Sequence, residues 1–274
     1  MKSIYLFFLL SLNICAQENI VFKDTLNNDN VTAIKNGKFG LYREGQTTIF
    51  EYDSIHLPHY VPEFCEYLFA KKDLWGVIDL DGNTLIPYEY DFIGYTHISV
   101  KSKEVVLIQK NNKLGTVNIK NKITVPIKYD AISIWVEAGP EAHYVMNAGK
   151  MGLIEYNGKE ILPIIYDSLY YYTNHVVKGK LNNKFGVVNN KNKTVIPFIY
   201  DALIVDIDYM GIEEYGHKDI FVVKKDDRWD YLNMDGSIYK MGIQEIEIRK
   251  QYAKFELTNY DFEYVGYCLV KPKK

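Results

Sequence analysis

The sequence has few of the features that mark a membrane protein, a nucleic-acid binder or a disulfide-stabilised fold. Its 274 residues include only three cysteines and eight prolines. No stretch is long and apolar enough for a transmembrane helix. The 32 Lys and Arg residues are balanced by 35 Asp and Glu residues, so no basic excess is present to neutralise phosphates. We therefore expect neither a transmembrane segment nor nucleic-acid binding.

Motifs for catalysis and metal binding are also missing. The sequence has no G-x-S-x-G nucleophile motif, no glycine-rich phosphate loop and no H-E-x-x-H motif. His56 and His59 lie three residues apart, but a third ligand is missing, so this pair predicts no metal site. The sequence thus predicts a protein that is not an enzyme and needs no cofactor.

The N-terminus has the layout of an export signal. An apolar run from Ile4 to Ile14 is too short to cross a bilayer, and Ala16 supplies a small residue before a cleavage point. We expect residues 1–16 to be a signal peptide and the protein to be periplasmic, surface-located or secreted. A lipid anchor on Cys15 is the alternative, although the large residue before it does not suit a lipoprotein signal.

Removal of that signal would leave Cys65 and Cys268. In an oxidising compartment the two could form a disulfide, or they could be two small buried side chains. Their positions in the sequence do not show whether their Cα atoms come within bonding range. Both alternatives stay open.

What the chain does have is a repeat. A large apolar residue precedes a glycine, a proline follows eleven residues after the glycine, and a Tyr-Asp pair ends the copy. Four copies keep every offset: Trp75, Gly76, Pro87, Tyr90 and Asp91; Leu114, Gly115, Pro126, Tyr129 and Asp130; Met151, Gly152, Pro163, Tyr166 and Asp167; Phe185, Gly186, Pro197, Tyr200 and Asp201. An earlier copy around Gly40 is two residues shorter, and a sixth around Trp229 is degenerate.

Each copy reads as a three-stranded antiparallel meander of about 36 residues. Turn dipeptides such as Asn36-Gly37, Asp81-Gly82 and Asn111-Asn112 separate its β-rich segments. No segment shows a long helical period, so helix should be scarce. We predict an all-β fold of about six tandem units, starting near residues 31, 68, 105, 144, 176 and 220, in one domain over residues 17–274. The units would form a propeller-like ring or an open, solenoid-like sheet.

The repeated residues favour structural roles. The large apolar residue should fill the core between units, and the glycine should mark a bulge or a close backbone approach. The proline should lie on an edge strand because it has no N–H to donate. The aspartate should accept backbone N–H bonds in a turn while the tyrosine packs. A residue that every unit needs is a residue that builds the unit.

The pattern [KR]-[WF]-G-x-[IV] followed by I-P-x-x-Y-D resembles the WG, or KWG, repeat of bacterial secreted and envelope proteins. The similarity extends from Lys35 to about Ile246 and is best from Leu74 to Ile93. The tryptophan survives only at Trp75 and Trp229. The resemblance implies an all-β repeat fold and a non-catalytic interaction module, and it transfers no catalytic residue.

Recognition should therefore use the connectors that do not repeat. Their candidate binding residues are His56, His59, Tyr60, Tyr170, Tyr171, Tyr172, His175, Tyr209 and Tyr215. Strand alternation alone would bury one or two of the three consecutive tyrosines. The expected role is a scaffold for a protein partner, and the alternative is a carbohydrate or cell-wall module. A weaker alternative is an enzyme whose site gathers Asp206, Asp208 and Glu213.

The C-terminal tail also looks β-rich. Residues 254–257 and 262–270 read as further strands separated by a turn at Thr258-Asn259. They could complete the last unit or pair with residues 20–23, which would cover a sheet edge that otherwise favours aggregation.

Overall fold

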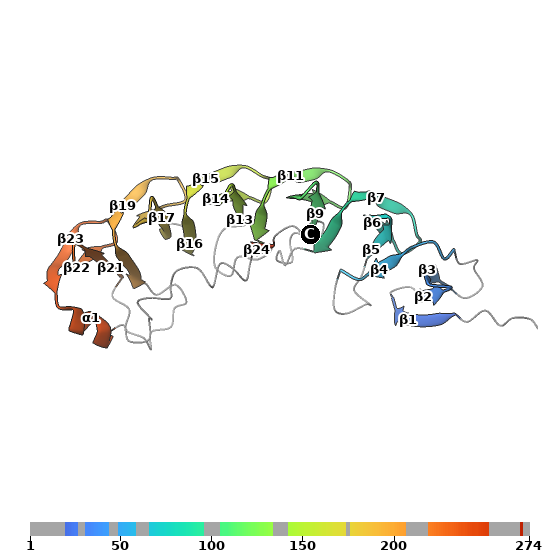
Figure 1. Ribbon diagram of the computed structural model, residues 1–274, viewed down its shortest axis with the longest axis horizontal. Coiled ribbons are helices and arrows are strands. Elements are labelled where there is room, and N and C mark those ends of the chain that lie inside the picture. Colours follow the sequence, from blue (N-terminus) through green and yellow to red (C-terminus); the bar gives the residue numbers. More distant parts are fainter. Residues whose placement is uncertain are drawn as a thin grey trace, which may run out of the picture. The chain divides into compact units, whose positions relative to one another are not determined.

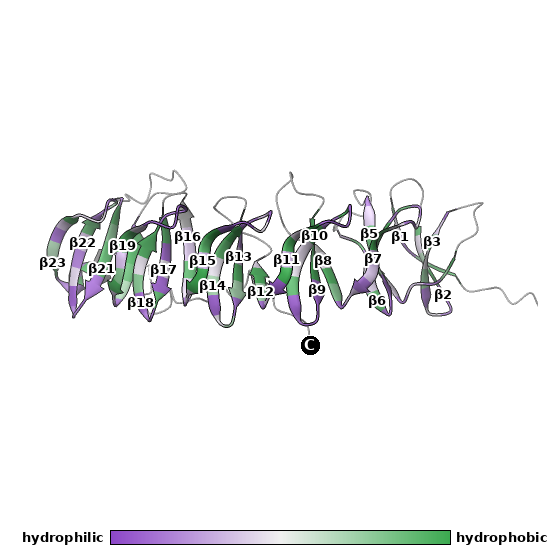
Figure 2. Cartoon of the chain, turned by 90° about the horizontal axis from the view of Figure 1, so that it is seen from above, coloured by the Kyte–Doolittle hydropathy of each residue, from purple (hydrophilic) through white to green (hydrophobic). Residues whose placement is uncertain are grey.

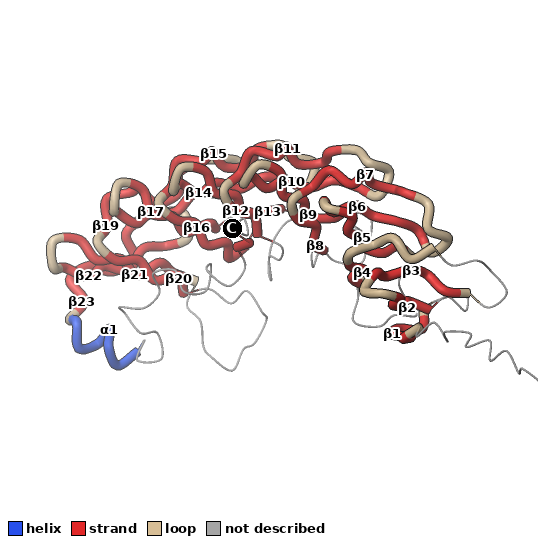
Figure 3. Tube along the Cα trace, turned by 45° about the vertical axis from the view of Figure 1, so that its right-hand side comes forward, coloured by secondary structure: helices blue, strands red, loops and turns tan. Residues whose placement is uncertain are grey.

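The computed structural model describes residues 20–26, 31–43, 49–58, 66–95, 105–133, 142–173, 176–206, 219–251 and 269–270 (Figure 1). Almost all of these residues lie in strands and tight turns, and the described part holds one short helix, α1 (Glu245–Gln251) (Figure 3). The predicted all-β fold of tandem antiparallel units is confirmed. The signal-peptide prediction for residues 1–16, and both Cys65 and Cys268, lie outside the described residues.

The described part of the chain contains 24 strands. In chain order they are β1 (Val21–Thr25), β2 (Val31–Lys35), β3 (Lys38–Tyr42), β4 (Ser54–His56), β5 (Tyr67–Lys72), β6 (Leu74–Asp79), β7 (Thr84–Tyr90), β8 (Phe92–Tyr95), β9 (Val105–Lys110), β10 (Lys113–Asn118), β11 (Ile123–Tyr129), β12 (Ala131–Ser133), β13 (Ala142–Asn147), β14 (Lys150–Glu155), β15 (Glu160–Tyr166), β16 (Ser168–Thr173), β17 (Val176–Leu181), β18 (Lys184–Val188), β19 (Thr194–Tyr200), β20 (Ala202–Asp206), β21 (Ile220–Lys225), β22 (Arg228–Asn233), β23 (Ile238–Ile243) and β24 (Leu269–Val270).

These strands form six antiparallel sheets. Their orders are β1-β2-β3, β4-β5-β6-β7, β11-β10-β9-β8, β15-β14-β13-β12-β24, β16-β17-β18-β19 and β20-β21-β22-β23. The chain divides into two compact units, one of Met1–Asp73 with Ile78–Asn83 and one of Leu74–Val77 with Thr84–Lys274. The last four sheets belong to the second unit.

Four strands, and not three, make up each regular sheet of the second unit. The additional strand begins directly after the aspartate of the Tyr-Asp pair. At Asp167, for example, β15 ends one residue before the aspartate, and β16 of the next sheet starts one residue after it. The Tyr-Asp pair is therefore the corner at which the chain leaves one sheet and enters the next.

Two kinds of turn shape each sheet. Between β9 and β10, Asn111 and Asn112 both have positive φ, 53° and 59°. This is the left-handed pair that a type I′ hairpin needs, and asparagine adopts it at low cost. Between β10 and β11 only Asn121 has positive φ, and its N–H donates to the carbonyl oxygen of Asn118 at 2.9 Å. The Asn118 side chain accepts the N–H of Lys122, also at 2.9 Å, which closes the loop.

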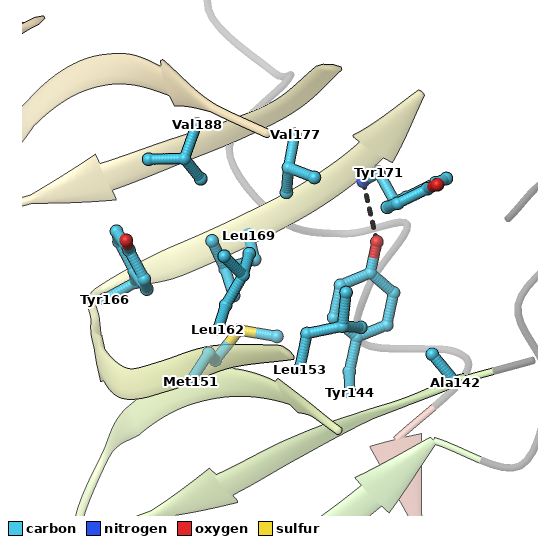
Figure 4. Packing of buried hydrophobic residues seen from close by; sticks show 10 residues of the cluster. All are labelled: Ala142, Tyr144, Met151, Leu153, Leu162, Tyr166, Leu169, Tyr171, Val177 and Val188. Atoms are coloured by element: carbon cyan, nitrogen blue, oxygen red, sulfur yellow. Dashed lines mark hydrogen bonds between the residues drawn. The ribbon is translucent and has the colours of Figure 1, made fainter. Parts of the chain in front are cut away.

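Neighbouring sheets of the second unit share one hydrophobic core after another. The strands carry the hydrophobic residues, while the turns at their ends are hydrophilic (Figure 2). One cluster joins β13–β15 to β16–β18 and consists of Ala142, Tyr144, Met151, Leu153, Leu162, Tyr166, Leu169, Tyr171, Val177 and Val188 (Figure 4). Equivalent clusters join β9–β11 to β12–β14, and β17–β19 to β20–β22. Burial of apolar side chains between successive sheets is thus the main source of stability here.

The C-terminal strand is placed differently from the expectation. Leu269 and Val270 pair antiparallel with Ser133 and Ile132 of β12, in the middle of the chain. They complete neither the last sheet nor a pair with residues 20–23. The other tail residues, 252–268 and 271–274, lie outside the described residues.

Candidate functional site

The repeated glycine lies where two backbones come too close for a side chain. A Cβ at Gly115 would lie 2.7 Å from the carbonyl oxygen of Val125 and 2.9 Å from the nitrogen of Ile127. The pairing of β10 with β11 shifts register at this point. A Cβ at Gly76, Gly152 or Gly186 would likewise lie 2.7, 2.9 or 2.8 Å from the carbonyl oxygen of Ile86, Leu162 or Ile196. Only glycine fits this approach without displacing the neighbouring strand.

The repeated proline directly follows each of those carbonyl residues. Pro87, Pro126, Pro163 and Pro197 lie on β7, β11, β15 and β19, each an edge strand of its sheet. Such an edge position tolerates a residue that has no N–H. Leu114, Met151 and Phe185, which precede the glycines, pack in the clusters between sheets, whereas Trp75 is half-buried.

The corner aspartate bonds to two successive sheets at once. Asp130 accepts a hydrogen bond from Lys113 Nζ of its own sheet. Its second carboxylate oxygen accepts the N–H of Ala148, in the first hairpin of the following sheet, at 2.7 Å. Its own N–H donates to the carbonyl oxygen of Met146 on β13 at 2.8 Å. One side chain and its backbone therefore join the β9–β11 meander to the β13–β14 hairpin.

The same arrangement recurs at the other corners. Lys38, Lys150 and Lys184 bond to Asp53, Asp167 and Asp201, and these aspartates accept the N–H groups of Asp73, Asn183 and Asp226. Asp91 accepts the N–H of Asn111 at 2.7 Å, but Leu74 stands where the other copies have lysine. The name corner aspartates is used below for Asp53, Asp91, Asp130, Asp167 and Asp201.

The electrostatics agree with this structural role. The Lys113 ammonium, followed by the Ala148 N–H, lowers the pKa of the Asp130 carboxyl. The Asn183 N–H and then Lys150 lower the pKa of Asp167. Each carboxylate is held ionised, with its hydrogen-bonding capacity used in the scaffold. A catalytic acid or base would need a pKa shifted toward neutrality.

The partner tyrosines belong to the core. Tyr90, Tyr129 and Tyr166 are at most 3% exposed. Burial raises the pKa of all three hydroxyls and brings that of Tyr90 to about 12. Tyr200, at the last corner, is half-buried. These side chains contribute packing area and stay neutral at physiological pH.

The β20–β23 sheet departs from the pattern. Asp230 replaces the glycine, accepts two hydrogen bonds from Arg228, and accepts the N–H of Gly242 at 2.9 Å. Gly242 itself has positive φ, 67°, and it lies where the pairing of β22 with β23 shifts register. Helix α1 follows in place of another corner, and its Ile248 packs on the outer face of the sheet.

The predicted binding residues are spread along the chain. His56 is exposed at the end of β4. Tyr170 of β16 is 37% exposed, whereas its neighbour Tyr171 is 5% exposed and packs in the core of Figure 4. Only the backbone of Tyr172 is described. His59, Tyr60, His175, Tyr209 and Tyr215 lie outside the described residues.

Tyr171 therefore supports the reading in which strand alternation buries part of the tyrosine run. Its N–H donates to the hydroxyl oxygen of Tyr144 at 2.6 Å, across two neighbouring sheets. Burial raises the pKa of the Tyr171 hydroxyl to about 12. Tyr170, with the opposite orientation on the strand, is exposed and could contact a ligand.

Most of the candidate binding residues lie in connectors that occupy the same place in each sheet. They leave the first strand of a sheet and return in its second strand, as between β12 and β13, or between β20 and β21. Because every regular sheet repeats this order, the connectors start from equivalent positions. One polar group near such a position, the buried His143 on β13, was not among the residues predicted from the sequence. Its apolar equivalents in the other copies were the available signal.

No group of three or more His, Cys, Asp or Glu residues that could hold a metal ion occurs in the described part of the chain. Within the same residues, no helix has the length and apolar character needed to cross a membrane. Asp206 is 5% exposed on β20, while Asp208 and Glu213 lie outside the described residues.

Fold and corner geometry define a tandem β-repeat protein in which each meander is bonded to the next. A family model described as WG containing repeat matches residues 75–113, 151–184 and 185–229. The chain carries WG repeats, and the resemblance found in its sequence is confirmed. No curated protein matches the chain.

Several solved structures are similar at low sequence identity. Hsv2p of Kluyveromyces lactis is 8% identical, with a TM-score of 0.32 over 78% of this chain and 74% of that one. PorZ, a surface component of the type IX secretion system of Porphyromonas gingivalis, is 10% identical, with a TM-score of 0.27 over 79% of this chain and 32% of PorZ. The extracellular domain of BT4673 from B. thetaiotaomicron is 11% identical, with a TM-score of 0.29 over 77% and 33%. The chain thus spans about a third of the latter two.

Proposed function

We propose that the protein is an exported, non-catalytic scaffold that binds a protein partner through the connectors between its repeats. One observation carries the proposal: the polar residues that recur in every copy are used in bonds that hold the copies together. In both Asp130 and Asp167, one carboxylate oxygen accepts a hydrogen bond from a lysine and the other accepts one from a backbone N–H. Recognition is therefore left to residues that differ between copies.

The composition of the connectors suits contact with a protein. Residues 205–219 contain Tyr209 and Tyr215 beside several carboxylates. Tyrosine provides a large rigid contact area with a polar tip, at a low cost in conformational entropy. Export is proposed from the apolar run of residues 4–14 and the small residue that follows it.

Photo-crosslinking tests the proposal directly. A photoreactive amino acid at Tyr209 or Tyr215 should capture one partner protein from cells that produce the chain, and the same group at Lys191, in an exposed turn, should not. Tyr209→Ala and Tyr215→Ala should then weaken binding of the purified partner about tenfold or more, with an unchanged melting temperature. Equal capture at Lys191, or unchanged affinity in both variants, would contradict the role of this connector.

The exposed Tyr170 favours the second candidate, a carbohydrate module. Binding to insoluble glycans that Tyr170→Ala abolishes, without loss of stability, would replace the protein-partner proposal with this one. Tyr171→Ala is the matched control for folding, because that side chain is in the core and its loss should lower stability instead.

A further inference from the structure

The β12–β15 sheet has a fifth strand that the other regular sheets of the second unit lack. Strand β24 pairs with the outer edge of β12, with Val270 opposite Ile132 and Leu269 opposite Ser133 (Figure 1). The edges of β8, β16 and β20 carry no added strand in the described structure. The outer edge of β12 therefore accepts an extended polypeptide, and the chain's own C-terminal strand occupies it.

Burial of the first strand distinguishes the two sheets at one position. Ala131, Ile132 and Ser133 of β12 are all 0% exposed. In β16 the corresponding Ser168 and Leu169 are also buried, at 3% and 1% exposed, but Tyr170, which corresponds to Ser133, is 37% exposed. The difference lies at Ser133, the residue opposite Leu269 of β24.

A buried polar pair fixes the end of β12. The Ser133 hydroxyl oxygen accepts the N–H of Tyr144 at 2.9 Å. The His143 ring donates from Nδ1 to the carbonyl oxygen of Ser133 at 2.8 Å. The regular backbone pairing of β12 with β13 involves Ala131 and Ile132. At Ser133 these two bonds take its place. They hold Ser133 in place from the inner side, so its outer side is ready to pair with a strand.

His143 is costly for a merely structural residue. It is 1% exposed, and its Nε2 has no hydrogen-bond partner among the residues that the structure describes. In the second strand of each sheet, one residue lies opposite the position of the repeated glycine. His143 lies two residues before it in its sheet, and the equivalent residues of three other sheets are Val106, Val177 and Phe221, all 0% exposed. An apolar residue fills this site well in three copies. The polar exception occurs in the one sheet that accepts a fifth strand.

We propose that the outer edge of β12 is a recognition site for an extended apolar segment of a partner polypeptide, and that β24 is the intramolecular occupant which that segment displaces. The inference rests on the proposed interaction function and adds the kind of partner. Main-chain bonds to a sheet edge give affinity for an extended peptide, and the side chains that alternate along the peptide give specificity for its sequence. Lys271, Lys273 and Lys274 follow the pairing residues, so the occupant seen here is a short apolar strand with a basic end.

Seventeen residues, 252–268, connect α1 to β24. Because β24 belongs to the same chain, its pairing with β12 is intramolecular, and an added peptide must compete with its effective concentration. A variant whose own strand cannot pair should therefore bind an added peptide more tightly than the wild type does. Proline removes the N–H groups that the pairing needs.

The test uses the full chain with Leu269→Pro and Val270→Pro, and a labelled peptide of residues 262–274 with serine at position 268. The peptide should bind this open variant at least about tenfold more tightly than it binds the wild type. A scrambled peptide, and one with proline at both pairing positions, should not bind. Equal binding to wild type and variant, or no binding above the scrambled peptide, would overturn the proposal.

Crosslinking locates the peptide on the sheet. With Cys65 and Cys268 replaced by serine, Ser133→Cys in the open variant should form a disulfide with a peptide that carries cysteine at position 269, since opposed residues of paired strands lie within bonding range. Tyr170→Cys on β16 is the matched control. Equal crosslinking at both cysteines would contradict the assignment to β12.

His143 is then a positioning residue with its own readout. His143→Val should weaken peptide binding to the open variant several-fold while thermal stability stays equal or rises. Unchanged binding would remove His143 from the proposal. A failure of all three experiments, with partner capture at Tyr209 intact, would reject the strand site and leave the proposed scaffold function standing.

Discussion

The β12–β15 sheet and the β20–β23 sheet follow one template and end differently. The first has Gly152 at the close approach and passes to its successor through Asp167, which bonds to Lys150 and to the N–H of Asn183. The second has Asp230 in place of the glycine and is followed by α1. The glycine and the corner aspartate occur together where another sheet must be joined, and the last sheet has neither.

The terminal sheet also shows what replaces a neighbour. On β7, β11, β15 and β19 the third residue is buried, as Ile86, Val125, Leu162 and Ile196. On β23 the third residue is Lys240, which is exposed, and Ile248 of α1 covers part of the outer face instead. A short helix thus covers part of this sheet in place of a further sheet, while Ile238, Tyr239 and Met241 of β23 stay exposed, at 60%, 62% and 51%.

The close approach gives the largest expected difference between the two sheets. Gly152→Ala should lower the free energy of unfolding by about 3 to 4 kcal/mol, because its Cβ would lie 2.9 Å from the Leu162 carbonyl oxygen and 3.0 Å from the Ile164 Cα. Asp230→Ala should cost only about 1 to 2 kcal/mol, since that position already holds a Cβ and the change leaves the Gly242 N–H without its acceptor. Urea unfolding measures both.

Gly179→Ala is the control for the glycine test. Its Cβ would meet only side-chain atoms, at 3.1 Å or more. We expect a loss below about 1 kcal/mol there. A similar loss at Gly152 and Gly179 would show that close backbone approach is not what selects the repeated glycine.

The stability of the two sheets should also respond differently to acid. Burial holds the pKa of His143 at about 4, against an ordinary value of 6.5. The unfolded chain therefore binds a proton below pH 6.5 that the folded chain takes up only near pH 4, so stability falls between these values, by about 3 kcal/mol at pH 4. His143→Val should remove this loss, and Phe221, its equivalent in the terminal sheet, has no charge to gain.

The corner aspartates respond in a lower pH window. Because the pKa values of Asp130, Asp167 and Asp201 are lowered, their contribution is present above the ordinary carboxyl pKa and disappears as pH falls below about 4. Melting temperatures of wild type and His143→Val from pH 7 to pH 3 distinguish the windows. A wild type that keeps its full stability down to pH 4.5 would contradict the account of His143.

Substitutions at a corner aspartate or its lysine should change the free energy of unfolding less than Gly152→Ala does. Asp167→Ala should lower the free energy of unfolding by about 1 to 2 kcal/mol, because it leaves the Asn183 N–H without its acceptor. Lys150→Ala should cost less than about 1 kcal/mol, since the pair is partly exposed and the aspartate keeps its backbone bond. Thermal unfolding of both variants ranks them, and a larger loss for the lysine would contradict this order.

The smallest expected effect is a rise in stability on restoring the missing lysine beside Asp91. Leu74 is 39% exposed and stands seventeen residues before Asp91, the offset at which lysine bonds to the aspartate in three later copies. Leu74→Lys should raise stability by a few tenths of a kcal/mol, and less in high salt. Leu74→Gln is the matched control without charge. Equal effects of the two substitutions would show that the missing ion pair is unimportant.

Much of this arrangement follows from the sequence, because the offsets between Gly115, Pro126 and Asp130 recur unchanged. They predict the all-β units, the close approach at the glycine and the bonding role of the aspartate. The fourth strand was missed, since three residues such as Ala131–Ser133 carry too little pattern to separate from the turn before them.

The long-range features were beyond the sequence for a different reason. The pairing of Leu269 with Ser133 joins segments more than 130 residues apart, and no local preference encodes such a register. The lysine partner of each aspartate was visible as a repeated residue, but the N–H of Ala148 has no side-chain signature. His143 could have been singled out by comparison with Val106 and Val177.

The central claim is that each corner aspartate protects one amide in the following sheet and no other. Amide hydrogen exchange measures this directly. In Asp130→Ala the Ala148 amide should exchange much faster while the Asn183 amide keeps its rate. In Asp167→Ala the Asn183 amide should exchange much faster while the Ala148 amide keeps its rate. Equal acceleration of both amides in either variant, or no change in both, would contradict the account.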